Sequence, residues 1–128
     1  MKDINLILLL EFIKRYKMEN LTLNEYQRQT RSTAIYPKEN LPVYPVLGLN
    51  GEAGEVADKL KKIIRDKEGV MSDEDKTELV LEVSDILWYV SQIASDLGYN
   101  LEDVARMNLA KLFSRKERGA LGGSGDNR

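Results

Sequence analysis

Two pairs of carboxylates, each with its members three residues apart, are the part of this sequence best suited to do chemistry. The first pair is Glu52 and Glu55 in the stretch E-A-G-E, and the second is Glu82 and Asp85 in E-V-S-D. Both stretches lie in an apolar pattern with the repeat of an α-helix. At about 100° per residue, a spacing of three places both carboxylates of a pair on one side of the helix.

The two pairs occupy matching positions around their helices. With Leu49 as the origin of the first helix and Leu79 as the origin of the second, each pair lies about 60° and 120° to the same side of the apolar arc. If the helices pack antiparallel with axes roughly 8–10 Å apart, the four carboxylates can meet. Their four negative charges repel one another unless a cation lies between them. Oxygen ligands without imidazole or thiolate suit Mg²⁺ or Mn²⁺. A single E-x-x-E pair is more often a solvated flank, so the metal site depends on both pairs meeting.

The composition restricts the remaining chemistry. The 128 residues are 42% hydrophobic and 31% charged, which is typical of one globular domain, and the net charge of −2 provides no basic field for nucleic acid. The absence of cysteine and histidine excludes thiolate nucleophiles, Ser-His-Asp triads and Glu-x-x-His di-iron bundles. Because no targeting pattern or membrane-length apolar run is present, we expect a cytoplasmic protein with neither nucleic-acid nor membrane partners.

The elements that must position the carboxylates all read as helices. Capping signals at Thr22, Ser72 and Asn100 and helix-terminating glycines predict helices over residues of about 2–18, 22–32, 45–67, 72–97 and 100–119. Strand-like alternation is absent, so we predict an all-α fold, a helical bundle with four or five helices. The apolar first helix can be buried against the body of the chain or against another subunit, and the sequence leaves both open.

The last helix combines polar and basic residues with its apolar stripe. Asn108 falls inside the stripe, while Lys111 and Arg115 fall at its edge. The helix dipole explains why bases gather near the C-terminal end, but not why two of them share a face with an amide. Because inward-facing polar groups are costly without partners, we interpret them as donors to an anion. Together with the carboxylates they suggest a metal–phosphate substrate.

With these residues identified, the sequence resembles the MazG-like nucleotide pyrophosphohydrolases of the all-α NTP pyrophosphatase superfamily. The resemblance rests on E-A-G-E at 52–55, E-V-S-D-I-L-W-Y at 82–89 and N-L-A-K-L-F-S-R at 108–115, and it extends over about residues 23–128. It implies a single MazG-like domain over residues 1–128. An extra N-terminal helix at 1–21 precedes a core bundle at 22–119, and a glycine-rich tail follows at 120–128.

The resemblance implies Mg²⁺-dependent cleavage of a nucleoside triphosphate, or its deoxy form, to the monophosphate and pyrophosphate in nucleotide-pool housekeeping, with Mn²⁺ as an alternative metal. The implied metal ligands are Glu52, Glu55, Glu82 and Asp85, and the implied phosphate-binding residues are Asn108, Lys111 and Arg115, with Lys59 and Lys62 as weaker candidates. Glu55, as the residue that activates water, and Glu82 are the expected catalytic residues. Lys59 is equally well placed to pair with Glu55 four residues earlier.

Other features are open at this point. A base pocket involving Tyr26, Gln27 and Trp88 is expected, although such aromatic residues more often belong to a core or interface. The resemblance implies a homodimer or homotetramer, and the G-D-N-R ending is either a flexible end or a segment that covers a neighbouring subunit's site. A dUTP- or dCTP-directed hydrolase differs only in pocket detail. The alternative from another class is a non-catalytic helical interaction or regulatory module.

Overall fold

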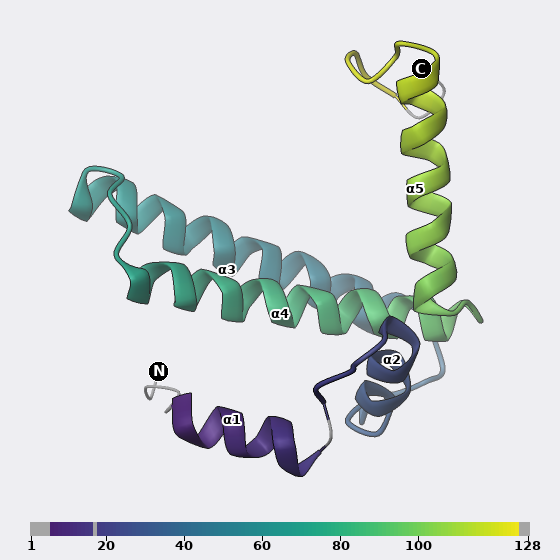
Figure 1. The fold of residues 1–128 in the computed structure, drawn as a ribbon, viewed down its shortest axis with the longest axis horizontal. Helices are drawn as coiled ribbons and strands as arrows, with labels where there is room; N and C mark the ends of the chain where they lie inside the picture. Colours follow the sequence, from purple (N-terminus) through teal and green to yellow (C-terminus); the bar gives the residue numbers. More distant parts are fainter. Residues whose placement is uncertain (1–5, 17, 126–128) are drawn as a thin grey trace.

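The computed structural model describes residues 6–16 and 18–125, in which helices are the only regular secondary structure. The helices are α1 (Leu6–Arg15), α2 (Leu23–Arg31), α3 (Val43–Lys67), α4 (Asp73–Asp96) and α5 (Leu101–Glu117). The long helices α3 and α4 form an antiparallel pair, α2 packs across α4 and α5, and α5 projects away from the end of the pair (Figure 1). The predicted all-α fold is confirmed.

The turn between α3 and α4 forms as the sequence predicts. Ser72 and Asp75 make a capping box, in which the Asp75 N–H donates to the Ser72 hydroxyl and the Ser72 N–H donates to the Asp75 carboxylate. Glu68 and Gly69 both have a positive φ, which ends α3 and reverses the chain. At its other end α3 begins at Val43, two residues before the proline expected in its first turn.

The α3–α4 pair is close because Gly48 has no side chain. A Cβ atom at Gly48 would lie 2.1 Å from a ring carbon of Tyr89, so the Tyr89 ring occupies the space that any other residue would need. This contact is one helical turn from Glu52 on α3 and one turn from Asp85 on α4. The contact therefore sets the separation of the two helices beside the acidic residues.

The start of α5 is capped by α2 rather than by its own N-cap residue. Asn100 makes no side-chain cap hydrogen bond, which corrects the prediction that it caps this helix. The Leu101 N–H instead donates to the side-chain oxygen of Gln27 at 2.7 Å, and the Glu102 N–H donates to that of Asn24 at 3.1 Å. These bonds satisfy two N–H groups that a helix leaves unpaired at its start, and they fix the direction in which α5 leaves the pair.

A buried ion pair attaches the segment after α2 to α4. The Arg31 guanidinium lies 2.7 Å from the buried Asp96 carboxylate and donates to the Gln92 side-chain oxygen. The Tyr36 hydroxyl donates to the other Asp96 oxygen at 2.8 Å. The Arg31 charge at one carboxylate oxygen and the Tyr36 hydroxyl at the other offset part of the cost of burying Asp96.

Much of the apolar surface of the helices stays uncovered in one chain. Ile63, Ala94 and Leu101 are buried, but Ile64 and Val83 on the predicted apolar arcs are exposed. The accessible surface is 9707 Å² for a chain of 14.6 kDa. A compact monomer of this mass exposes only about 6,900 Å². The excess, roughly 2,800 Å², is what an open arrangement of helices produces.

The N-terminal helix makes no close backbone approach to the other four (Figure 1). Its apolar side chains are exposed, among them Leu8, Leu10 and Phe12. Of the two expected arrangements, burial against the body of the same chain is therefore not the one the structure adopts. No helix in the described ranges has both the length and the apolar character to cross a membrane.

Candidate metal and nucleotide site

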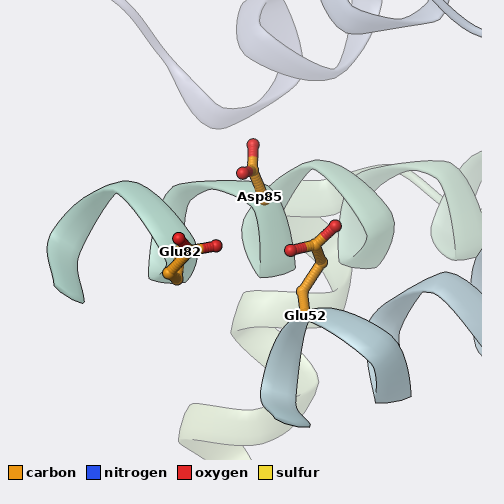
Figure 2. A group of neighbouring side chains, drawn as sticks. All are labelled: Glu52, Glu82 and Asp85. Carbon is orange, nitrogen blue, oxygen red and sulfur yellow. The ribbon is translucent and has the colours of Figure 1, made fainter. Parts of the chain in front are cut away.

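Three of the four predicted carboxylates lie together between α3 and α4. Glu52 reaches from α3 toward Glu82 and Asp85 on α4 (Figure 2), and each offers an oxygen within 4.8 Å of the other two. We call these three residues the acidic cluster. Glu52 and Glu82 are partly buried and Asp85 is exposed, so the cluster is at the surface but not fully solvated.

The electrostatics of the acidic cluster favour a bound cation. Burial, and then the charges of Asp85, Glu82 and Glu55, raise the pKa of Glu52 above its ordinary value. Burial and then the Glu82 charge raise the pKa of Asp85 as well. The ionised form of both carboxylates is therefore less stable in the folded protein than in water. Three oxygen donors, whose negative charge the Lys59 ammonium beside Glu82 offsets only in part, fit a hard divalent cation such as Mg²⁺.

Glu55 lies outside the acidic cluster. It is exposed on α3, one turn beyond Glu52, and it acts on the cluster only as the last of the causes that raise the Glu52 pKa. Three of the four carboxylates expected to bind metal thus lie together, and the fourth is open to solvent; their role as metal ligands stays a prediction.

Lys59 pairs across the helices and not along its own helix. Its ammonium lies 3.1 Å from Glu78 and 3.4 Å from Glu82, both on α4, and the hydrogen bond from Lys59 to Glu78 is the main cause of its raised pKa. The expected pairing with Glu55 is replaced by this contact. Lys59 therefore borders the acidic cluster. Glu78, which sequence reasoning missed, could have been found because it lies one turn before Glu82 on the same face of α4.

Lys62 is not brought to the acidic cluster. It is exposed and forms an ion pair with Asp58, one turn earlier on α3. An exposed pair of this kind contributes little to stability. In this chain its contact is the ordinary i,i+4 pairing of a solvated helix face.

The three predicted phosphate-binding residues of α5 do not face the acidic cluster within one chain. α5 approaches α4 and α2 but not α3 (Figure 1). Asn108 and Lys111 are exposed, contrary to their expected inward position, and they line a groove of about 470 Å³ between α4 and α5. Arg115 is buried. On α4 the groove begins at Val90, beyond the acids, because α5 diverges from the pair at that end.

A second and larger pocket lies directly beside the acidic cluster. It measures about 790 Å³, and its lining includes Asp85, Trp88 and Tyr26. The Trp88 indole N–H donates to the Thr33 hydroxyl at 2.9 Å, which fixes the ring. Burial and then the charge of Asp85 raise the pKa of Tyr26. Two of the three predicted base-pocket residues thus line one cavity next to a candidate metal ligand.

Gln27, the third predicted base-pocket residue, has a structural role instead. It is buried and does not line this pocket. Its amide donates to the Ser95 hydroxyl at 3.0 Å and to the Tyr99 carbonyl at 2.8 Å, while its oxygen accepts from the Leu101 N–H. The side chain holds α2, α4 and α5 together and has no group left to contact a base.

Tyr89 is an additional candidate that the sequence reading left among core aromatics. Its ring fills the space above Gly48, and burial followed by the charges of Tyr44, Glu52 and Asp85 raises its pKa. The hydroxyl is therefore within the electrostatic reach of the acidic cluster. The signal was its position one turn after Asp85.

The protein is all-helical, and two facing helices each contribute acids to one cluster. Residues 45–119 match the MazG nucleotide pyrophosphohydrolase domain, and the chain belongs to this family. It is also similar to the "Gene 37 protein" of Mycobacterium phage L5, at 49% identity over 110 residues that span 80% of this chain and 96% of that protein. No solved structure matches the chain.

Proposed function

We propose that this protein is a Mg²⁺-dependent pyrophosphohydrolase that cleaves a nucleoside or deoxynucleoside triphosphate to the monophosphate and pyrophosphate, in the cytoplasm, as part of nucleotide-pool housekeeping. The observation that carries the proposal is the acidic cluster, which two facing helices build in a chain of the MazG family. Mn²⁺ has the same preference for oxygen ligands and is the expected substitute.

Each residue near the acidic cluster has a role in this proposal. Glu52, Glu82 and Asp85 would hold the metal, which when bound supplies positive charge to the phosphate oxygens. Exposed Glu55 would accept the proton of a water that attacks the α-phosphorus, while the bond to the bridging oxygen breaks and pyrophosphate leaves. Lys59 would exchange its contacts with the α4 glutamates for contacts with the leaving phosphates.

We propose that Asn108, Lys111 and Arg115 serve the acidic cluster of a second copy of the chain. They are the expected phosphate ligands, yet their helix diverges from the cluster in one chain. The surface excess of roughly 2,800 Å² over a compact monomer is of the size that a stable subunit contact buries. A homodimer or homotetramer would cover this surface and bring a cationic helix to an anionic site. The expected G-D-N-R cover falls partly on residues 126–128, which lie outside the described residues.

A product assay tests the reaction. Purified protein is incubated with Mg²⁺ and a panel of ribo- and deoxynucleoside triphosphates, including dUTP and dCTP, and pyrophosphate and orthophosphate are measured separately. Pyrophosphate as the primary product is expected, and Glu82→Gln should abolish its release with an unchanged circular dichroism spectrum. Orthophosphate as the primary product would reject cleavage between the α and β phosphates. A folded protein with no turnover of any substrate would favour the non-catalytic interaction module.

Co-expression of two inactive variants tests whether the site is shared. Chains with Glu52→Gln and chains with Lys111→Met should each be inactive alone. If α5 acts across the subunit contact, one of the two sites in each mixed dimer is intact. Because about half of randomly formed dimers are mixed, about a quarter of the normal activity should return. Absence of recovery, or a monomer by light scattering, would contradict the shared site without touching the metal cluster.

A further inference from the structure

The pocket beside the acidic cluster has a wall that comes from outside the family match. Its lining includes Asp85 and Trp88 on α4 and several residues of α2, but also Tyr16, Met18 and Leu21 from the chain before α2. We call these last three residues the N-terminal wall. The match to the MazG domain covers residues 45–119, so the N-terminal wall and the α2 residues of the lining both lie outside the part of the chain that carries the acids.

The end of α1 sets the local shape of the N-terminal wall. The Tyr16 ring stacks on Phe12 with centroids 5.9 Å apart and planes inclined by 2°, and the Tyr16 N–H donates to the Phe12 carbonyl. The Met18 N–H donates to the Ile13 carbonyl at 2.9 Å. These contacts turn the chain at the end of the helix and present two apolar side chains and one aromatic side chain to the pocket.

Trp88 is held on the α4 side of the same pocket. Its ring meets Tyr36 and Tyr89 edge-on, at centroid separations of 6.3 and 5.0 Å, and its N–H is already bonded to Thr33. The indole is therefore fixed in orientation without any ligand. A rigid aromatic ring and an apolar wall in one pocket suit a flat ring with polar edges, because stacking on an aromatic side chain is favourable for every nucleobase.

The position of the pocket relative to the acidic cluster also fits a nucleotide. Asp85 belongs to both, and Trp88 follows it by one turn of α4. A molecule with its phosphates at the cluster would extend its base toward Trp88 and the N-terminal wall. The hydroxyl groups of Ser32 and Ser84 border the cavity. Each donates to a carbonyl three residues earlier in the chain and keeps a lone pair that can accept from a base edge.

We propose that Tyr16, Met18 and Leu21 determine which nucleobase this protein accepts, by closing the pocket opposite Trp88. The proposal rests on the proposed function, since it assigns the base end of the same substrate. Base choice is then set by a segment that can vary while the acidic cluster and its chemistry stay unchanged. Contacts with an apolar wall discriminate between similar ligands by about 10- to 200-fold per added or missing methylene.

Trp88 provides a direct measurement because it is the single tryptophan of the chain. Its fluorescence is titrated with cytidine, uridine, adenosine and guanosine, and separately with inorganic tripolyphosphate, in EDTA so that neither metal nor turnover contributes. Nucleosides should change the emission and tripolyphosphate should not. Leu21→Ala, alone and with Met18→Ala, should weaken nucleoside binding about tenfold, reduce the spread among the four bases and make Trp88 more accessible to acrylamide.

Leu9→Ala is the matched control. Leu9 and Leu21 are the same residue type and are both 42% exposed, but Leu9 is on α1 away from the pocket. Equal effects of the two substitutions, or an unchanged ranking of bases in the double variant, would overturn the proposal, as would wild-type protein that binds no nucleoside. If nucleosides bind as expected but no triphosphate releases pyrophosphate, the proposed function fails and the N-terminal wall stands. A Mg²⁺-induced rise in melting temperature that is the same in all variants shows that the acidic cluster is intact.

Discussion

Replacing Glu52 by glutamine is expected to stabilise the metal-free protein and to remove its stabilisation by Mg²⁺. The substitution keeps the shape of the side chain and removes one of three negative charges that lie within 4.8 Å of one another. Two unit charges at this distance repel by about 1 kcal/mol in water and about 3.5 kcal/mol at an effective dielectric constant of 20. Because Asp85 is exposed, the lower figure applies, and we expect a gain of about 1 kcal/mol, or about 3 °C in melting temperature.

The pH dependence of this gain has a defined sign. The pKa of Glu52 is raised in the folded protein, so the native state binds more protons than the unfolded chain between the ordinary value of 4.5 and the raised value. The folding free energy that Glu52 contributes is therefore lost as the pH rises through this window, and the penalty is fully present above it. The difference in stability between Glu52→Gln and wild type should be near zero below pH 4.5 and reach its full size at neutral pH. Taking the difference cancels the titration of the acids that do not interact with Glu52.

Thermal melts in EDTA and in millimolar Mg²⁺, from pH 4 to pH 8, test both parts. Mg²⁺ at a hundred times its dissociation constant should stabilise the wild type by about 2.7 kcal/mol and leave Glu52→Gln nearly unmoved. Glu55→Gln is the control, since Glu55 is on the same helix but outside the cluster, and its effect without metal should be smaller. A Glu52→Gln protein that melts below wild type in EDTA, or that keeps the full Mg²⁺ shift, would refute the reasoning.

Three further substitutions test the frame around the cluster. Gly48→Ala should lower the free energy of unfolding in urea by about 1–3 kcal/mol and weaken Mg²⁺ binding, because the added methyl group collides with Tyr89. Gly51→Ala, with open space around it, should raise the free energy of unfolding by up to about 1 kcal/mol. Equal effects of the two substitutions would contradict the close packing. Lys59→Met should lower the melting temperature in EDTA and tighten Mg²⁺ binding measured by calorimetry, because the lysine neutralises a carboxylate of the acidic cluster when metal is absent. Weaker Mg²⁺ binding in this variant would argue against that role. Asp96→Asn should lower the free energy of unfolding in urea by about 3 kcal/mol, because Arg31 then keeps an uncompensated charge. A loss below about 1 kcal/mol would show that the ion pair is dispensable.

The sequence was most informative where a short repeat determines geometry. The matched spacing of the acids on two helices predicted that four carboxylates meet. Glu52, Glu82 and Asp85 do, because helical angle and antiparallel packing leave little freedom, whereas Glu55 stays outside the cluster. The position of Asn108 could not be predicted in the same way. Its angle on α5 was readable, but the direction of α5 is set by the hydrogen bond that the Leu101 N–H donates to Gln27, 74 residues away in the sequence. Helical periodicity gives the face of a helix and not where the helix points.

The α3–α4 pair combines a repulsive cluster with two close constraints that oppose it. The capping box at Ser72 holds the turn at one end, and the contact of Gly48 with Tyr89 holds the helices together one turn from Glu52 and Asp85. Between these points the two helix backbones cannot move apart without breaking packing, which keeps the Cα atoms of the three acids close. The charge therefore stays concentrated and is relieved most effectively by a cation. Packing that prevents the acids from relaxing is thus the physical basis of the proposed affinity for Mg²⁺.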